Sequence, residues 1–200
     1  MSRGLVRFST AVLCLAALCL QTHAQSSRHP AWKAPLVAAR DKQDIHYLSK
    51  VVEGQIAVGD KAAPSMTYLR ALASSYLGEV YLEQGKKAEA AAAAERGIGL
   101  AREFLRADAN SAEGHLLLGA LCGQVIPANL FSALSYGKCA REEVETALRL
   151  NPRLSEAYLG RGVGNYYLPP ALGGGVDKAI EDFRKAAELA PDSPEVQLWL

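Results

Sequence analysis

Two cysteines in the second half of the chain, Cys122 and Cys139, have a spacing that suits a disulfide. We expect Cys122 near the end of one helix and Cys139 near the start of its antiparallel partner, which would bring the two thiols close together. In an oxidising compartment a bridge would close a loop of about 18 residues and stabilise the fold by about 3 kcal/mol. The alternative is two separate buried thiols that pack as small apolar groups.

The histidines offer little coordinating chemistry. His29, His46 and His115 are scattered, and none has a second ligand at the spacing of a metal motif. A site built from His115 and the two cysteines is an alternative, but the sequence favours no metal site and no cofactor.

A glycine run at 173–175 precedes a predicted helix, and such a loop can hold a phosphate. This one lacks the Gly-Lys-Ser/Thr ending and a preceding strand, so we interpret it as a turn after Pro169 and Pro170. The sequence contains no nucleophile elbow, zinc-protease helix or acid pair. We therefore expect no catalytic residues and no enzyme activity, although a triad assembled only in space is not visible in a sequence.

The helices that carry these residues recur along the chain. In the first helix of each unit a glycine follows a bulky residue, and the three glycines are 41 and 43 residues apart: Leu77-Gly78 before Tyr81, Leu118-Gly119, and Gly162. The second helices share an Ala-x3-bulky-x2-Ala-x4-Pro pattern at an offset of 39 residues: Ala140, Val144, Ala147 and Pro152, then Ala179, Phe183, Ala186 and Pro191.

This pattern predicts pairs of antiparallel helices. Small residues such as Gly119 and Ala140 let two helix axes approach, and bulky residues such as Leu118 and Val144 fill the remaining space. The proline after each second helix ends it. Because one hairpin cannot bury its apolar faces alone, successive hairpins should stack.

The repeat resembles the tetratricopeptide repeat family over about residues 70–200. The resemblance is carried by NPRLSEAYLGRGVGNYY, by VDKAIEDFRKAAELAPDSPE and by SSYLGEVYLEQGKKAEAAAAAERG, with Leu77, Gly78, Tyr81, Gly85 and Ala90 in family-like places. It implies an all-α, right-handed solenoid of helical hairpins with about three and a half repeats. Family repeats have 34 residues, whereas these units are longer because of insertions at 124–138 and 168–176, as in some exported bacterial members.

The expected organisation is a leader at 1–24, a flexible lead-in at 25–36 and a repeat domain at 37–200. Within the repeat domain we expect a half repeat at 37–64 with one helix from Val37 to Val58. Three units at 65–109, 110–152 and 153–191 follow, and a further first helix starts at 192–200.

The leader has the features of a secretory signal peptide. Arg3 and Arg7 precede the short apolar run 11–20, and a small-x-small site ends at Ala24. Cleavage after Ala24 would place the mature protein in the periplasm or outside the cell. A membrane anchor and a lipoprotein linked through Cys19 are the alternatives; the apolar run is about half the length of a spanning helix.

The charge balance, 22 basic against 21 acidic residues, argues against a nucleic-acid partner. No stretch of the mature chain is apolar enough to span a membrane. The family resemblance implies a groove lined by first helices that binds a protein or peptide partner. Its candidate binding residues are Glu113, His115, Tyr158 and Tyr166. An accessory subunit of a solute transporter that binds a small ligand is the second hypothesis.

Overall fold

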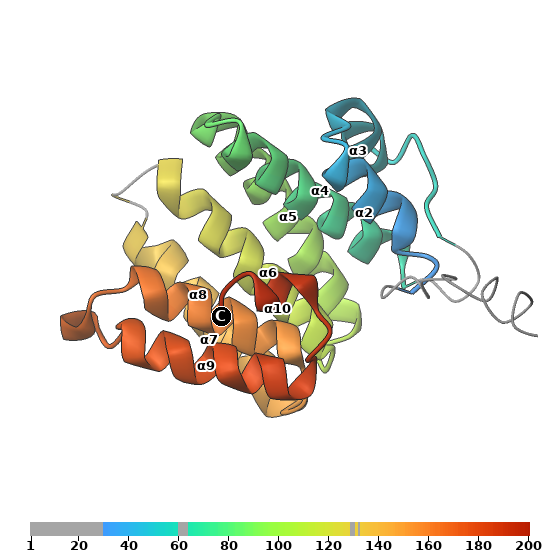
Figure 1. Ribbon diagram of the computed structural model, residues 1–200. Helices are drawn as coiled ribbons and strands as arrows, with labels where there is room; N and C mark the ends of the chain where they lie inside the picture. The colour runs from blue at the N-terminus through green and yellow to red at the C-terminus, as the bar shows by residue number, and fades with distance from the viewer. Residues whose placement is uncertain (1–29, 60–63, 129–130, 132) are drawn as a thin grey trace, which may run out of the picture.

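A computed structural model describes residues 30–59, 64–128, 131 and 133–200, and Figure 1 shows them as a layered stack of helices. The described part of the chain has no β-strand. Its helices are α2 (Ala34–Asp41), α3 (Ile45–Val52), α4 (Met66–Glu83), α5 (Lys87–Ala107), α6 (Ala112–Val125), α7 (Ala133–Leu150), α8 (Ser155–Tyr167), α9 (Val176–Leu189) and α10 (Pro194–Gln197), with short 3₁₀ turns η1 (Ile126–Ala128) and η2 (Pro170–Leu172).

The helices pack as antiparallel hairpins, α4 with α5, α6 with α7 and α8 with α9, and each hairpin packs against the next. Along one side the first helices lie next to one another, α2 beside α4, α4 beside α6 and α6 beside α8. The predicted all-α array of helical hairpins is therefore confirmed. We call the surface formed by α2, α4, α6 and α8 the first-helix face.

Serine caps fix where α4, α6 and α10 begin. The side-chain oxygens of Ser65, Ser111 and Ser193 accept hydrogen bonds from backbone N–H groups three residues on, at the starts of α4, α6 and α10. Each cap satisfies a donor that the helix itself leaves unpaired. Gly85, with φ +73°, then turns the chain from α4 into α5.

Close helix contacts occur at the glycines of the repeat. A Cβ atom added at Gly119 would lie 2.9 Å from Val144 Cγ2 and 3.1 Å from the Ala140 carbonyl oxygen, both on α7. One added at Gly162 would lie 2.5 Å from the Phe183 ring on α9. Gly119 and Gly162 thus lie where the partner helix of their own hairpin leaves no room for a side chain.

The main hydrophobic core runs from α2 to α6, and a smaller cluster joins α7 to α8. In the main core Leu69, Leu77 and Leu121 are fully buried. In the smaller cluster Val144, Ala147, Leu148 and Ala157 pack together. Each first helix therefore packs against its own partner and against the neighbouring unit.

The first part of the repeat domain differs from our expectation. The single helix expected from Val37 to Val58 is two helices, because Asp44 caps α3 and Gln43 adopts a positive φ of 52°. Helix α2 also begins within the expected flexible lead-in, and Leu36 there is fully buried. Burial of this apolar residue holds the segment in place. The predicted signal peptide and cleavage site lie outside the described residues.

Both predicted insertions contain short helical turns. The stretch at 124–138 includes the end of α6, η1 and the start of α7, and the 168–176 loop includes η2. Gly173 and Gly175 have positive φ values of 92° and 119°, and the Gly174 N–H donates to the Pro169 carbonyl oxygen. Because Lys178 Nζ donates to the Gly173 carbonyl, the glycine run forms a turn closed by contacts of its own chain.

Candidate functional site

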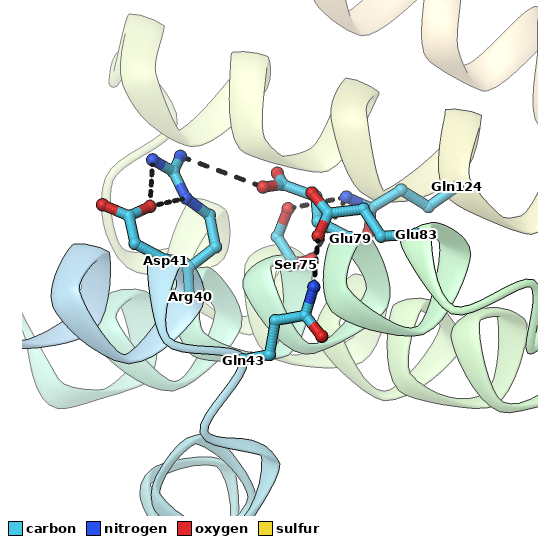
Figure 2. A network of polar contacts seen from close by, with 7 residues as sticks. All are labelled: Arg40, Asp41, Gln43, Ser75, Glu79, Glu83 and Gln124. Atoms are coloured by element: carbon cyan, nitrogen blue, oxygen red, sulfur yellow. Dashed lines mark hydrogen bonds and ion pairs between the residues drawn. The ribbon is translucent and has the colours of Figure 1, made fainter.

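A polar network lies on the first-helix face between α2 and α4 (Figure 2). The Arg40 guanidinium donates from Nε and an Nη atom to one carboxylate oxygen of Asp41, at 3.0 and 2.9 Å. Its other Nη atom lies 3.9 Å from Glu79 Oε2, and the group stacks 5.1 Å from the centre of the Tyr76 ring. Arg40 therefore joins two acids and an aromatic ring across two helices.

A second set of contacts extends this network toward the end of α4. Gln43 Nε2 donates to Glu83 Oε2 at 3.1 Å, and Gln84 Nε2 donates to Gln43 Oε1 at 3.0 Å. These side chains are exposed, so the hydrogen bonds compete with water and each contributes little to stability. Their effect is to hold polar groups in a row along this end of the face.

Glu79 is the most perturbed acid in the network. Its side chain is 39% exposed, yet loss of solvent around the carboxylate raises its pKa to about 7. The charge of Arg40 lowers the pKa and that of Glu83 raises it, so removal from solvent is the largest effect. A carboxyl that titrates near neutral pH can change its charge when a charged partner arrives.

Acids also surround the start of α4. Removal from solvent, together with the charges of Glu113 on α6 and Glu156 on α8, raises the pKa of Tyr68 to about 12. Glu113 and Glu156 are both exposed. Acids in the first turns of α6 and α8 therefore act on a tyrosine at the start of α4.

The far end of the array approaches this same face. Removal from solvent raises the pKa of Tyr76 on α4 well above its ordinary value, and Glu195 of α10 is among the charges that add to the shift. Trp199, just after α10, stacks on Tyr166 and Phe183 with ring centres 5.8 and 5.1 Å apart. The segment just after α10 therefore packs on α8 and α9 through Trp199.

The structure does not bring the four predicted binding residues together. Glu113 and His115 are two residues apart on α6 and point to opposite sides of that helix. The Tyr158 hydroxyl donates to the Pro152 carbonyl at 3.3 Å, and its ring packs against the smaller core cluster. Tyr166 is 49% exposed and lies beside Trp199.

His115 faces the second helices instead of the first-helix face. Its Nδ1 atom lies 2.6 Å from Glu143 Oε2 on α7, and its Nε2 atom lies 3.0 Å from the Ala109 carbonyl oxygen. Both partners are acceptors, so both contacts are satisfied together only when both ring nitrogens carry hydrogen. The imidazole ring links the α5–α6 turn to α7.

The structure joins Cys122 and Cys139 in a disulfide, with Cα atoms 6.1 Å apart. Cys122 lies in the last turns of α6 and is fully buried, and Cys139 lies in the second turn of α7. The bridge ties the two ends of the inserted stretch at 124–138 together. Over the described residues, no group of three histidine, cysteine or acidic side chains is arranged to hold a metal ion.

Two buried polar clusters were not found from the sequence. Gln124 Nε2 on α6 donates to the hydroxyl and carbonyl oxygens of Ser75 on α4, at 3.0 and 3.2 Å. Its Oε1 atom has no hydrogen-bond donor among the described residues and lies 2.7 Å from where a Gly78 Cβ would be. The Gln124 amide therefore occupies the space that a side chain at position 78 would fill. A larger residue in place of Gly78 would displace this amide.

The other cluster lies inside the last hairpin. Asp182 is 5% exposed and accepts hydrogen bonds from Arg161 Nε and an Nη atom, the shortest at 2.6 Å. Asn165 Nδ2 donates to its other oxygen at 2.9 Å. Paired contacts of this kind satisfy a buried carboxylate, so this cluster is a packing element of the α8–α9 hairpin.

A sequence signal for the Arg40 network does exist in α4. Glu79 and Glu83 are acids four residues apart, on one side of a helix that is otherwise mostly buried. A charged stripe on such a helix marks its solvent-facing side. Helix α2 gave no comparable signal. Its residues were divided between the expected lead-in at 25–36 and the single helix expected from Val37 to Val58.

No family model matches this chain, and no curated protein matches it. Among solved structures it is similar to the first TPR of Spaghetti (RPAP3) bound to the HSP90 peptide SRMEEVD, at 22% identity over 64% of this chain and 85% of that chain, with a TM-score of 0.39. It is also similar to MamA, at 20% identity over 81% and 80% with a TM-score of 0.38. A third is YrrB, described as a TPR protein with an unusual peptide-binding site, at 14% identity over 82% and 89% with a TM-score of 0.38.

The assignment of this chain as an array of helical hairpins rests on its own helices and their packing. None of its described helices is both long and apolar enough to cross a bilayer.

Proposed function

We propose that this chain is an exported scaffold that binds a protein or peptide partner through its first-helix face. The observation that carries the proposal is the set of acidic side chains on this face, Glu79, Glu113 and Glu156. They come from three successive hairpins and lie near tyrosines whose pKa values they raise. A surface that spans several units suits an extended segment better than a small molecule, because each unit contributes only part of it.

Export is the second part of the proposal. A disulfide between Cys122 and Cys139 suits an oxidising compartment and is uncommon in the cytosol. The leader at 1–24 would deliver the chain there. Mass spectrometry of the protein recovered from the periplasm or medium should find Gln25 at its N-terminus; a chain that keeps residues 1–24 would refute the cleavage.

Partner binding is tested by chemical cross-linking in the exported fraction, followed by mapping of the linked residues. Glu113→Lys reverses a charge on the first-helix face, and Glu181→Lys reverses a matched exposed charge on α9. We expect the first variant to lose the partner and the second to retain it. If both variants behave like the unmodified chain, the first-helix face is not the binding surface.

The alternative, an accessory subunit of a transporter, predicts a different result in the same experiment. No protein would then be retained, and a small solute would raise the melting temperature of the chain by mass action. We propose no catalytic function.

A further inference from the structure

A second surface of interest lies on the opposite side of α6 from Glu113. It is an open depression with a volume of about 550 Å³, lined by residues of α5, α6 and α7: Arg102, Leu105, Arg106, His115, Leu118 and Glu143. Ligand sites for small molecules commonly occupy about 300 to 1,000 Å³. The depression is therefore large enough for a compact organic ligand.

Two basic side chains, Arg102 and Arg106, line this depression. Arg102 and Arg106 are four residues apart on α5, so their side chains share one side of the helix. Neither guanidinium forms an ion pair with a carboxylate in the described ranges; the contact found is Arg106 Nε with the Arg102 carbonyl oxygen at 3.5 Å. Two neighbouring cations that lack acidic partners favour an anion between them.

The one acid that lines the depression is already engaged. Glu143 accepts from His115 at 2.6 Å, and the Ala109 carbonyl holds the opposite ring nitrogen. Two arginines and one carboxylate line the depression. The charges of Arg102 and Arg106 therefore set the net charge of the depression, which is positive.

The rest of the depression is apolar. Leu118 is 3% exposed and forms part of the core, and Leu105 is half-buried and packs against that core. A ligand seated between the arginines would therefore rest its body on the exposed part of Leu105. Removal of apolar surface from water would add to the attraction between the opposite charges.

We infer that this depression binds an organic anion, with its carboxylate or phosphate group held by Arg102 and Arg106 and its apolar body on Leu105. A planar guanidinium presents paired N–H donors that match both kinds of oxyanion. This inference is independent of the proposed function, because the two surfaces lie on different sides of α6 and share no residue.

The test uses three probes with the same ring: phenyl phosphate, benzoate and the neutral benzamide. Binding to the purified protein is followed by isothermal titration and by backbone amide shifts. We expect both anions to bind at least about tenfold more tightly than benzamide, to shift amides of α5 and α6, and to weaken as salt is added. Comparison of the two anions identifies the preferred head group.

The paired variant Arg102→Gln and Arg106→Gln should weaken anion binding by about tenfold or more. Arg184→Gln, an exposed arginine on α9, is the matched control and should leave binding unchanged. Both sites on α5 are exposed, so the variants should fold, and thermal melts verify this. Equal binding of benzamide and benzoate, unchanged binding in the paired variant, or no saturable binding of either anion would overturn the inference.

Discussion

Reduction of the Cys122–Cys139 disulfide should lower the free energy of unfolding by about 3 kcal/mol. The two cysteines are 17 residues apart in sequence, and the bridge connects the end of α6 to the start of α7. A cross-link of this span removes conformations from the unfolded chain, and the loop-closure relation gives about 3 kcal/mol at 25 °C. For a domain of this size the melting temperature should fall by about 6 to 12 °C.

The assay is urea unfolding of the chain without residues 1–24, in which Cys122 and Cys139 are the two cysteines. Oxidised protein is compared with protein refolded in a reductant, because the buried Cys122 is protected in the folded state. Reduction keeps both sulfur atoms, so the packing volume is nearly unchanged and the difference reports the cross-link. Cys139→Ala is the control, and its unfolding midpoint should not respond to reductant.

Two results would refute the reasoning about this bridge. One is an unfolding midpoint that is the same with and without reductant in the unmodified chain. The other is alkylation of both thiols in protein that was denatured without reductant, which would show that the cysteines were never joined. Either result would also remove the main support for an oxidising compartment.

Two further perturbations test the first-helix face and the packing of the repeat. The pKa of Glu79 is about 7 in the folded chain and near 4.5 in the unfolded chain. The folded chain therefore binds this proton more tightly, and the free energy of unfolding should fall as pH rises from about 4.5 to 7. Glu79→Gln should therefore stabilise the chain at pH 8 by up to about 1 kcal/mol after solvent screening, and hardly at all at pH 4. Thermal melts at both pH values measure this difference. The raised pKa of Glu79 would be contradicted if Glu79→Gln shifted the melting temperature equally at the two pH values, or if the exposed Glu181→Gln gave the same pattern. In α8, Gly162→Ala should destabilise the chain by about 1 to 3 kcal/mol, because the new methyl would lie 2.5 Å from the Phe183 ring. Gly164→Ala adds the same methyl where no atom lies within 4 Å, so chemical denaturation should show that the free energy of unfolding rises by up to about 1 kcal/mol. If both variants lost a similar amount of stability, helix packing would not be the cause.

Local pattern accounts for the candidate residues that the sequence located well. The cysteines could be placed because Cys122 lies three residues after Gly119 and Cys139 lies directly before Ala140, so each falls in a predicted helix. The acids Glu79 and Glu83 carry a similar local signal, since they share one side of α4. Glu113 and His115 show the limit of such reading: two positions apart on a helix means opposite sides, so they could not have lined one groove.

Contacts between distant parts of the chain could not be found in this way. The Arg40 network depends on α2 packing beside α4, and the α2–α3 break depends on Asp44 capping a new helix. The hydrogen bonds of Gln124 to Ser75 join residues 49 positions apart. No periodicity in the sequence encodes pairs like these, because they form only when successive units have stacked.

The sequence alone determined the helical hairpins, since a period of about 3.6 residues and the recurring glycines act within single helices and between adjacent ones. It also fixed which residues are small enough for two axes to approach, as at Gly119 and Gly162. The tertiary structure decided which charged side chains meet. Those contacts between charged side chains depend on how strongly the stack of hairpins curves and on which side of each helix is left exposed. These are properties of all the units together, because each interface adds its own rotation to the next.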